Sequence, residues 1–208
     1  MKVMDTKGII INEALTLFSK KGYDGASVRD IAAAVGIKAA SLYKHFSSKE
    51  DIFDGILDEM SKRYNDAIQR MQVPSGEAQS VADEYMQITQ ETLVKIATNL
   101  FLYFLKDDFA AKFRRLLTIE QFRSSKAGSM FQDFFLDSPI NFQSELFKKM
   151  MENGTFKKCD PYIMAMHFYA PIFVLLNKYD RLPEKEEEAI QYISKHVIQF
   201  SKIYSTEK

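Results

Sequence analysis

Apolar residues recur at helical spacing along most of this chain, and residues 27–51 are its most informative stretch. The apolar residues of 28–35 follow one another at intervals of three and four, which predicts a short helix with one buried face. Gly36 comes where that helix must end and where the backbone needs a positive φ. A second helix is predicted over residues 38–45, which completes the plan of a helix-turn-helix. The predicted inward residues are Val28, Ile31, Ala32, Val35, Ile37, Leu42 and Phe46.

Helical spacing continues through the rest of the chain, without an alternating strand pattern, an internal repeat or a low-complexity segment. A first helix is predicted over about residues 6–20. A long fourth helix is predicted to begin at a capping box formed by Ser47 and Glu50 and to fade near residues 73–76. The sequence therefore predicts an all-α fold of about nine or ten helices.

Caps and helix breakers divide this pattern into elements. Ser27 and Asp30 have the spacing of a capping box at the start of the first helix of the motif. Pro139 should kink or split its helix. Asp160 precedes a proline that can open a helix, and Pro183 separates the last two helices. We expect those helices at about residues 161–180 and 186–204.

The outward face of the predicted second helix carries chemistry suited to DNA. No carboxylate lies between residues 31 and 49, so nothing there repels phosphate. Over 27–49, four Lys or Arg residues face one Asp, which gives a net charge of +3. The alternative is an ordinary solvated helical hairpin, because basic residues on exposed helix faces are common. The outward residues are Lys38, Ala39, Ser41, Tyr43, Lys44 and His45.

The residue types and spacings of this stretch resemble those of a known family. The agreeing residues are Ala14, Phe18, Gly22, Tyr23, Ser27, the run from Ile31 and Ala32 to Gly36 and Ile37, the run Leu42-Tyr43-Lys44-His45-Phe46, and Ser48-Lys49-Glu50. Over about residues 5–60 the chain resembles the amino-terminal domain of the TetR family of transcriptional regulators. Ala39 and Ala40 depart from the family, many of whose members carry a longer side chain or a glycine there.

The resemblance implies roles for individual residues on duplex DNA. Tyr43 would donate its hydroxyl to a phosphate, and His45 would contact phosphate as well. The phosphate-backbone set is Ser27, Arg29, Tyr43, Lys44, His45 and Lys49. The residues implied at the floor of the major groove are Lys38, Ala39, Ala40 and Ser41, where alanine methyls can touch thymine methyls.

Composition and charge support a DNA-binding end on a mildly acidic body. The 208 residues carry no net charge, but residues 1–50 hold eight Lys or Arg and five Asp or Glu, and the remainder is correspondingly acidic. The single Cys159 excludes an internal disulfide and fits a reducing cytoplasm. The isoleucine run near the amino terminus does not resemble a signal peptide, and residues 162–176 are too short to span a bilayer. We expect a cytoplasmic, bacterial protein.

The functional boundary is predicted at the start of the fourth helix, because a continuous helix can transmit a tilt. Residues 1–47, extending into 48–72, would form the DNA-binding domain. Residues 48–208 would form a helical domain for effector binding and dimerisation. The resemblance implies an effector cavity in that domain, although most of its aromatic residues are more simply explained as core. The candidate wall residues are Phe101, Phe104, Phe131, Phe134, His167 and Phe168.

We expect a homodimer through the last two helices, because residues 162–176 are apolar on nearly every side. A dimer would also supply the two recognition helices that an operator needs. The predicted function is a repressor that a small lipophilic effector releases from a palindromic operator. A transcriptional activator, or a ligand sensor with little DNA role, is the alternative within the same fold. Three histidines without a metal-ligand cluster, and no phosphate-binding glycine loop, argue against an enzyme, and no cofactor is predicted.

Overall fold

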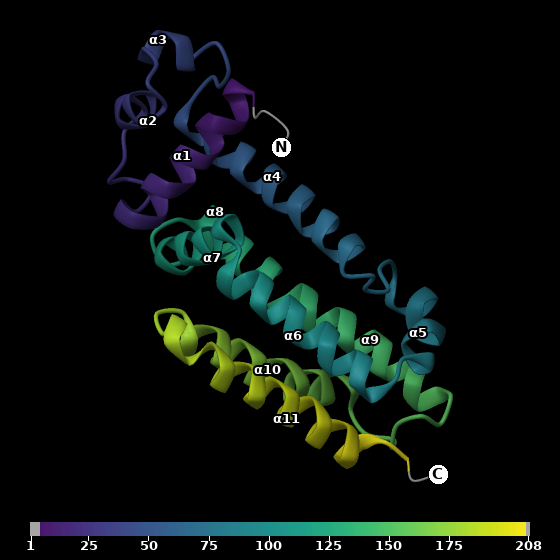
Figure 1. Cartoon of the computed structure of the whole chain (residues 1–208). Coiled ribbons are helices and arrows are strands. Elements are labelled where there is room, and N and C mark those ends of the chain that lie inside the picture. The colour runs from purple at the N-terminus through teal and green to yellow at the C-terminus, as the bar shows by residue number, and fades with distance from the viewer. Residues whose placement is uncertain (1–4, 207–208) are drawn as a thin grey trace. The chain divides into compact units, whose positions relative to one another are not determined.

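The computed structural model describes residues 5–206, and these residues form an all-α protein, as predicted (Figure 1). Because α8 and α9 continue into one another through a π-helical segment, the described residues form ten separate helical bodies. The elements are α1 (Thr6–Lys21), α2 (Val28–Val35), α3 (Ala39–Leu42), α4 (Lys49–Arg70), α5 (Ala78–Gln87), α6 (Gln90–Lys106), α7 (Asp108–Glu120), α8 (Ser125–Gln132), π-helical η1 (Asp133–Asp137), α9 (Ser138–Glu152), α10 (Pro161–Tyr179), 3₁₀-helical η2 (Pro183–Lys185) and α11 (Glu186–Tyr204).

The chain divides into two compact units. Unit 1 contains the residues up to Asp66 together with Asp107–Phe131, and unit 2 contains Ala67–Lys106 and the residues from Gln132 onward. Helix α4 begins in unit 1 and ends in unit 2. The division by contacts therefore differs from the predicted functional boundary between residues 47 and 48, which remains a prediction. Among residues 5–206, no helix combines the length and apolar character that crossing a bilayer requires.

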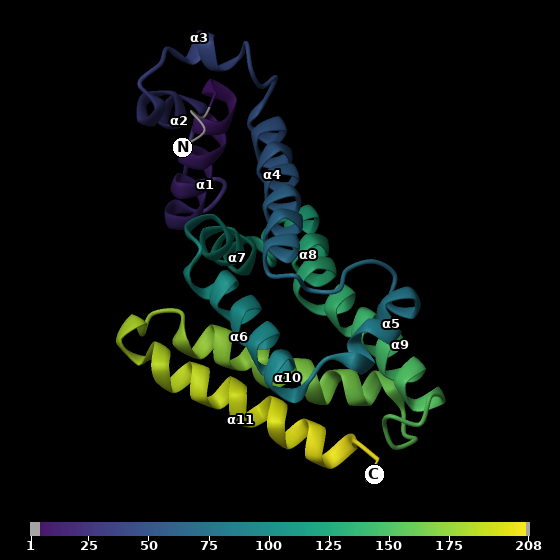
Figure 2. The same ribbon diagram turned by 45° about the vertical axis from the view of Figure 1, so that its right-hand side comes forward.

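The core of unit 1 is formed by apolar side chains of α1, α2, α4 and α7. Ile10 and Phe18 of α1 are fully buried, as are Ile52 and Ile56 of α4. Helix α1 ends at Gly22, whose φ of 77° favours glycine. In Figure 2, α3 lies at one end of this unit and α7 at the other, with α1 between them.

The capping box predicted for α2 is present in full. The Ser27 hydroxyl oxygen accepts the Asp30 backbone N–H at 3.1 Å, and the Asp30 carboxylate accepts the Ser27 backbone N–H at 2.7 Å. The Ser27 hydroxyl also donates to the same carboxylate at 2.6 Å. These bonds hold the pKa of Asp30 below its ordinary value, because they stabilise the ionised form.

The capping box predicted for α4 is placed one residue too early. The Asp51 backbone N–H donates to the Ser48 hydroxyl at 3.0 Å, so Ser48 is the capping residue. The Asp51 carboxylate accepts the Ser47 backbone N–H at 2.7 Å. Both Ser47-x-x-Glu50 and Ser48-x-x-Asp51 fit the spacing, and the shorter aspartate makes these bonds, which lower its pKa.

Unit 2 is built from α5, α6 and the helices from η1 to α11. The predicted break at Pro139 takes the form of η1, after which Pro139 occupies the first turn of α9. Asp160 caps α10 as predicted, accepting the N–H groups of Tyr162 and Ile163. The large buried residues at the centre of unit 2 are Phe147, Phe156 and Phe200 in one cluster and Phe101, Leu176 and Tyr179 in another.

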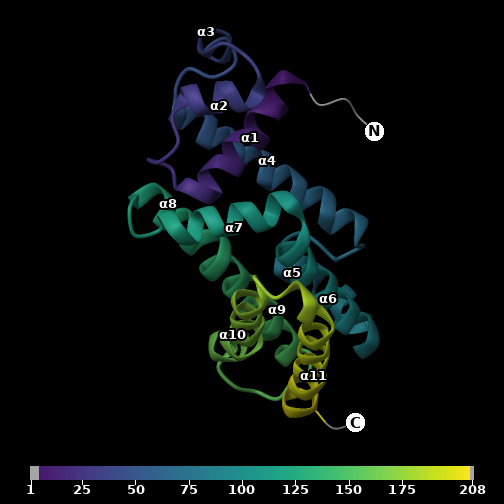
Figure 3. The ribbon, with the colours of Figure 1, turned by 60° about the vertical axis from the view of Figure 1, so that its left-hand side comes forward.

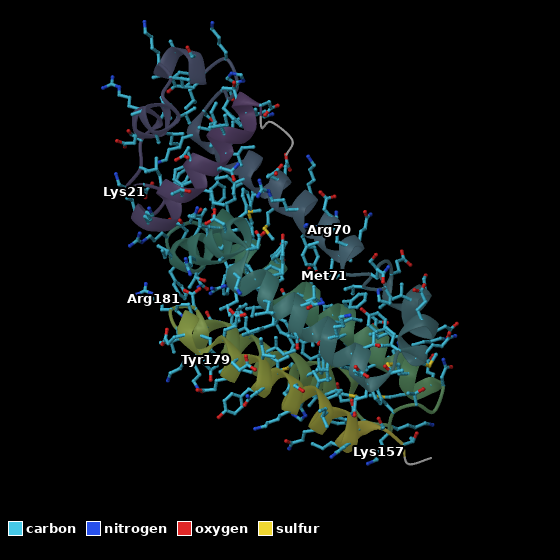
Figure 4. All side chains as sticks on the ribbon, in the orientation of Figure 1. Lys21, Arg70, Met71, Lys157, Tyr179 and Arg181 are labelled. Atoms are coloured by element: carbon cyan, nitrogen blue, oxygen red, sulfur yellow. The ribbon has the colours of Figure 1, made fainter. Side chains whose placement is uncertain are left out.

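Helices α10 and α11 pack against each other and are joined by a partly buried hydrogen bond. Tyr179, labelled in Figure 4, is almost fully buried and donates its hydroxyl to Glu188 at 2.5 Å. This bond raises the pKa of Tyr179 and lowers that of Glu188. The pairing fixes the end of α10 against the first turns of α11.

Asp30→Asn should lower the thermal unfolding midpoint at neutral pH, because it removes the charge that the α2 cap stabilises. The pKa of Asp30 in the folded state lies below its ordinary 3.8, so its contribution is present above that pH and is lost as the pH falls through the lowered value. The gap between wild type and variant, measured by circular dichroism, should therefore close on acidification. A gap that stays constant down to the acid transition would contradict this cap.

Candidate nucleic-acid interface

The predicted helix-turn-helix is formed by α2, a glycine turn and α3. Gly36 has a φ of 77°, and its N–H donates to the carbonyl of Ala33 at 3.1 Å. The Ile37 N–H donates to the carbonyl of Ala32 at 2.9 Å, which completes a Schellman motif. Apart from its neighbours along the chain, nothing among residues 5–206 lies within 4 Å of the place where a Gly36 side chain would begin, so the backbone conformation is what favours glycine here.

The second helix of the motif is shorter than predicted. Instead of spanning residues 38–45, α3 covers only Ala39–Leu42, and Lys38 precedes it with an extended backbone. Beyond Leu42 the chain continues in tighter turns, in which the His45 N–H donates to the Leu42 carbonyl at 2.9 Å. A helix of one turn gains few internal bonds, so tertiary contacts determine where it stops.

Two buried anchors orient this segment. Leu42 is fully buried and Phe46 nearly so, as predicted, and they hold α3 and the following turn against the core of unit 1. Tyr43 therefore points outward and is 53% exposed. Ala39, Ser41 and Lys49 are half-buried, and the exposed members of the predicted DNA-binding set are Ser27, Arg29, Lys38, Ala40, Tyr43, Lys44 and His45.

Two predicted phosphate contacts already have partners within the protein. The Ser27 hydroxyl donates to the Asp30 carboxylate, so donating it to a phosphate would require breaking this bond, although the two capping-box bonds could remain. The Lys49 ammonium lies 4.1 Å from the centroid of the Tyr23 ring and 5.8 Å from that of Phe18. The structure thus brings Lys38, Ala40, Tyr43, Lys44 and His45 together on one outward segment, and Ser27 and Lys49 make contacts within the protein.

Lys7 is a basic neighbour of this surface that the sequence pattern did not reveal. Its ammonium lies 5.2 Å from the centroid of the Phe46 ring, and Phe46 is the residue that follows the outward turn. Lys7 is exposed and comes from the start of α1, more than thirty residues away along the chain. Only the folded arrangement places this charge beside Phe46 and near the carboxylate of Asp51, so no sequence signal could have found it.

The predicted effector-cavity residues are only partly brought together. Phe104 contacts Phe134 edge-on at 6.1 Å between ring centroids, and Phe101, Phe104 and Phe168 share one apolar cluster of unit 2. Phe131 belongs to unit 1. His167 is exposed and hydrogen-bonds the Tyr204 hydroxyl rather than facing the cluster, so its assignment to the apolar wall is not supported by its position.

Two other aromatic residues were missed in unit 2. Phe135 contacts Phe104 at 5.8 Å, and its backbone carbonyl accepts a hydrogen bond from the Tyr169 hydroxyl at 2.8 Å. This carbonyl lies in η1, where the wider helix changes the usual pattern of backbone bonds. Tyr169 sits within a long apolar run, so its spacing gave no sign of this contact. Over residues 5–206, no group of three His, Cys, Asp or Glu side chains is arranged to hold a metal ion.

Comparison with known proteins gives a consistent picture of the amino-terminal segment. Residues 10–56 match the family model of the bacterial regulatory proteins of the tetR family. The same region is 58% identical over 48 residues to IcaR of Staphylococcus aureus, a negative transcriptional regulator of the icaADBC biofilm operon, and 55% identical over 47 residues to IcaR of Staphylococcus epidermidis. The match to the S. aureus protein covers 23% of this chain and 26% of that relative, so the chain spans about a quarter of its length.

Solved structures share the fold over nearly the whole chain. A complex of SmeT with triclosan has a TM-score of 0.67 at 16% identity, covering 97% of this chain and 92% of that one. SmeT is the repressor of a multidrug efflux pump of Stenotrophomonas maltophilia. The TetR-family regulator PfmR of Thermus thermophilus has a TM-score of 0.59 at 20% identity, covering 96% and 99%. At these identities the likeness establishes the fold alone.

Tyr43→Phe should weaken binding to every duplex by about tenfold or more, because a hydrogen bond to a charged phosphate contributes at least about 1.5 kcal/mol. Lys38→Ala should instead change which base pairs are preferred. Fluorescence titrations at fixed salt with a panel of duplexes separate the two effects. If Tyr43→Phe binds every duplex as tightly as wild type, Tyr43 has no phosphate contact.

Proposed function

We propose that this member of the TetR family of bacterial regulatory proteins is a repressor that binds an operator through the surface around α3 and is released by a small lipophilic effector. The observation that carries the proposal is the outward Tyr43 and Lys44 in the turn that directly follows the anchored α3, in a stretch free of carboxylates from residue 31 to 49. The sign of regulation is supported by the likeness of this same segment to a negative regulator.

DNA binding is tested by titrating the wild-type protein with the DNA upstream of its own gene. The affinity should fall as salt rises, with a slope of about −0.9 per phosphate contact. A duplex of unrelated sequence should bind far more weakly and serves as the control. If the upstream and unrelated duplexes bind equally weakly at every salt concentration, the protein is a ligand sensor without this DNA role.

A homodimer through α10 and α11 is part of the proposal. The exposed faces of these helices carry large apolar side chains. Their contact with water costs free energy in a lone subunit. Val174 is 60% exposed, and Ile163 and Met166 lie on the same face of α10 at helical spacing. Tyr192 and Ile203 are exposed on α11. A second copy of the chain would cover this surface, and binding an operator as a pair would require the two α3 segments to lie about 34 Å apart, one turn of DNA.

Effector binding in unit 2 is supported by its aromatic contacts and by two unsatisfied polar groups. The side-chain oxygens of Thr98 in α6 and Gln143 in α9 are buried, and neither has a hydrogen-bond partner within the described chain. A mostly apolar ligand with one polar group would satisfy such an oxygen. SmeT, which shares this fold, is known in complex with triclosan. By linkage, an effector that lowers operator affinity must itself bind less tightly by the same factor when operator is present.

Val174→Asp should convert the dimer into a monomer and reduce operator affinity by more than tenfold, because a buried unpaired carboxylate is costly and one reading helix contacts few base pairs. Sedimentation velocity measures the mass, and the operator titration measures the affinity. Val174→Thr keeps the shape without a charge and should remain mostly dimeric. A Val174→Asp variant that stays dimeric would place the interface elsewhere.

A further inference from the structure

Between two stretches of unit 2, the chain enters unit 1 and forms α7 and most of α8 there. The chain leaves unit 2 after Lys106, builds α7 and the turn that follows, and returns to unit 2 at Gln132. Within unit 1, α7 packs along α1, whose other end lies towards α3 (Figure 3). The α7–α8 turn, the segment from Glu120 to Lys126, joins α7 to α8. Its charged side chains contact the end of α1 and the first turns of α4.

Glu120, the last residue of α7, makes the first of these contacts. It is 2% exposed, and its Oε1 atom accepts the backbone N–H of Tyr23 at 3.0 Å. A side chain at Gly22 would begin only 2.8 Å from this same oxygen. The φ of 77° favours glycine at this position, and a larger residue would also force the Glu120 carboxylate to shift. Arg123 of the same turn lies 3.6 Å away and partly neutralises the charge.

The position of Glu120 is unfavourable on electrostatic grounds. The carboxyl end of a helix carries partial negative charge, so a carboxylate is repelled by the end of α1. Burying a carboxylate carries a desolvation cost, which contacts with the Tyr23 N–H and with the Arg123 guanidinium at 3.6 Å offset. Apolar residues would pack this position at lower cost. A buried acid at a costly place points to a role in holding a specific geometry.

Lys126, at the start of α8, makes the second contact. Its ammonium pairs with the carboxylate of Asp54 and lies 3.4 Å from that of Glu50, both in the first turns of α4. Between the two contacts lies Tyr23, whose ring packs edge-on against Phe53 of α4 at 5.5 Å. The turn thus contacts the end of α1 and the beginning of α4, which are the two helices that carry α2 and α3 between them.

We propose that the α7–α8 turn positions the DNA-binding helices, with Glu120 as the positioning residue and Lys126 as its second attachment. The inference rests on the proposed function, since it assigns the turn a role in operator binding. Glu120 fixes Gly22 and Tyr23, and the chain reaches the Ser27 cap of α2 only a few residues later. Loss of the contact frees the connection between α1 and α2, so that the reading surface must be ordered when DNA binds.

The test uses the full-length protein and a duplex that wild type selects from a random-sequence pool. Glu120→Ala should weaken binding about tenfold, the size of one hydrogen bond to a charged group. Glu120→Gln keeps an oxygen that can accept the Tyr23 N–H and should restore binding to within about threefold of wild type. Asp108→Ala, which removes an exposed carboxylate from the same helix, should change affinity less than about twofold.

A double-mutant cycle identifies the contact itself. Gly22→Ala strains the backbone in any background, but it collides with the carboxylate only when Glu120 is present. Its effect on duplex affinity should therefore be smaller in the Glu120→Ala background than in wild type. Lys126→Met acts at a partly exposed position and should weaken binding about threefold, so the proposal stays testable if Glu120→Ala does not fold.

The outcomes separate this inference from the proposed function. If wild type selects no duplex, the proposed DNA-binding function is itself wrong. If wild type binds, but Glu120→Ala or Lys126→Met lowers only the thermal midpoint and leaves duplex affinity within twofold, the turn is structural and the inference is overturned. Equal effects of Gly22→Ala in both backgrounds would also overturn it. Weaker binding by folded Glu120→Ala, with rescue by Glu120→Gln, would establish the positioning role.

Discussion

The candidate interface depends on the burial of Leu42 and Phe46 on either side of an outward Tyr43. Helix α3 has a single turn, and isolated helices of that length do not form in water. Burial of each anchor contributes about 2 kcal/mol, which supplies the tertiary support that the backbone bonds lack. Because the side chains of residues 42 and 46 share one face, the intervening Tyr43 and Lys44 must point to solvent. The same contacts that make the segment stable thus expose the groups that would bind DNA.

The rest of unit 1 extends this support away from α3. The capping box of Ser27 and Asp30 fixes where α2 begins, and Gly36 fixes where it ends. Arg63 of α4 links three helices, since its guanidinium stacks 4.2 Å from the ring centroid of Phe109 in α7 and approaches Asn12 of α1. Unit 1 therefore includes α7 and much of α4 as well as the helix-turn-helix, and changes along the chain can reach α3 through packed helices rather than through a flexible linker.

Local signals predicted most of the fold, and contacts between distant residues account for what was missed. Ser27, Asp160 and Pro139 act on their own neighbours, so their effects could be predicted from spacing. The length of α3 depends on tertiary contacts, and the choice of Asp51 over Glu50 depends on which of two correctly spaced acids accepts the free N–H group. Glu120 contacts a residue 97 positions earlier, and nothing in its sequence surroundings distinguishes it from an exposed glutamate. His167 was placed by the apolar run around it, whereas its ring bonds the Tyr204 hydroxyl.

The proposed function requires that the outward surface around Tyr43 enters the major groove of DNA, once from each subunit of a symmetric pair. Methylation of guanine N7, which lies in that groove, tests it most directly when methylated duplexes are sorted into protein-bound and unbound fractions. Methylation should block binding of the protein at two clusters of guanines centred about 10 base pairs apart. Tight binding that no guanine methylation disturbs would contradict it.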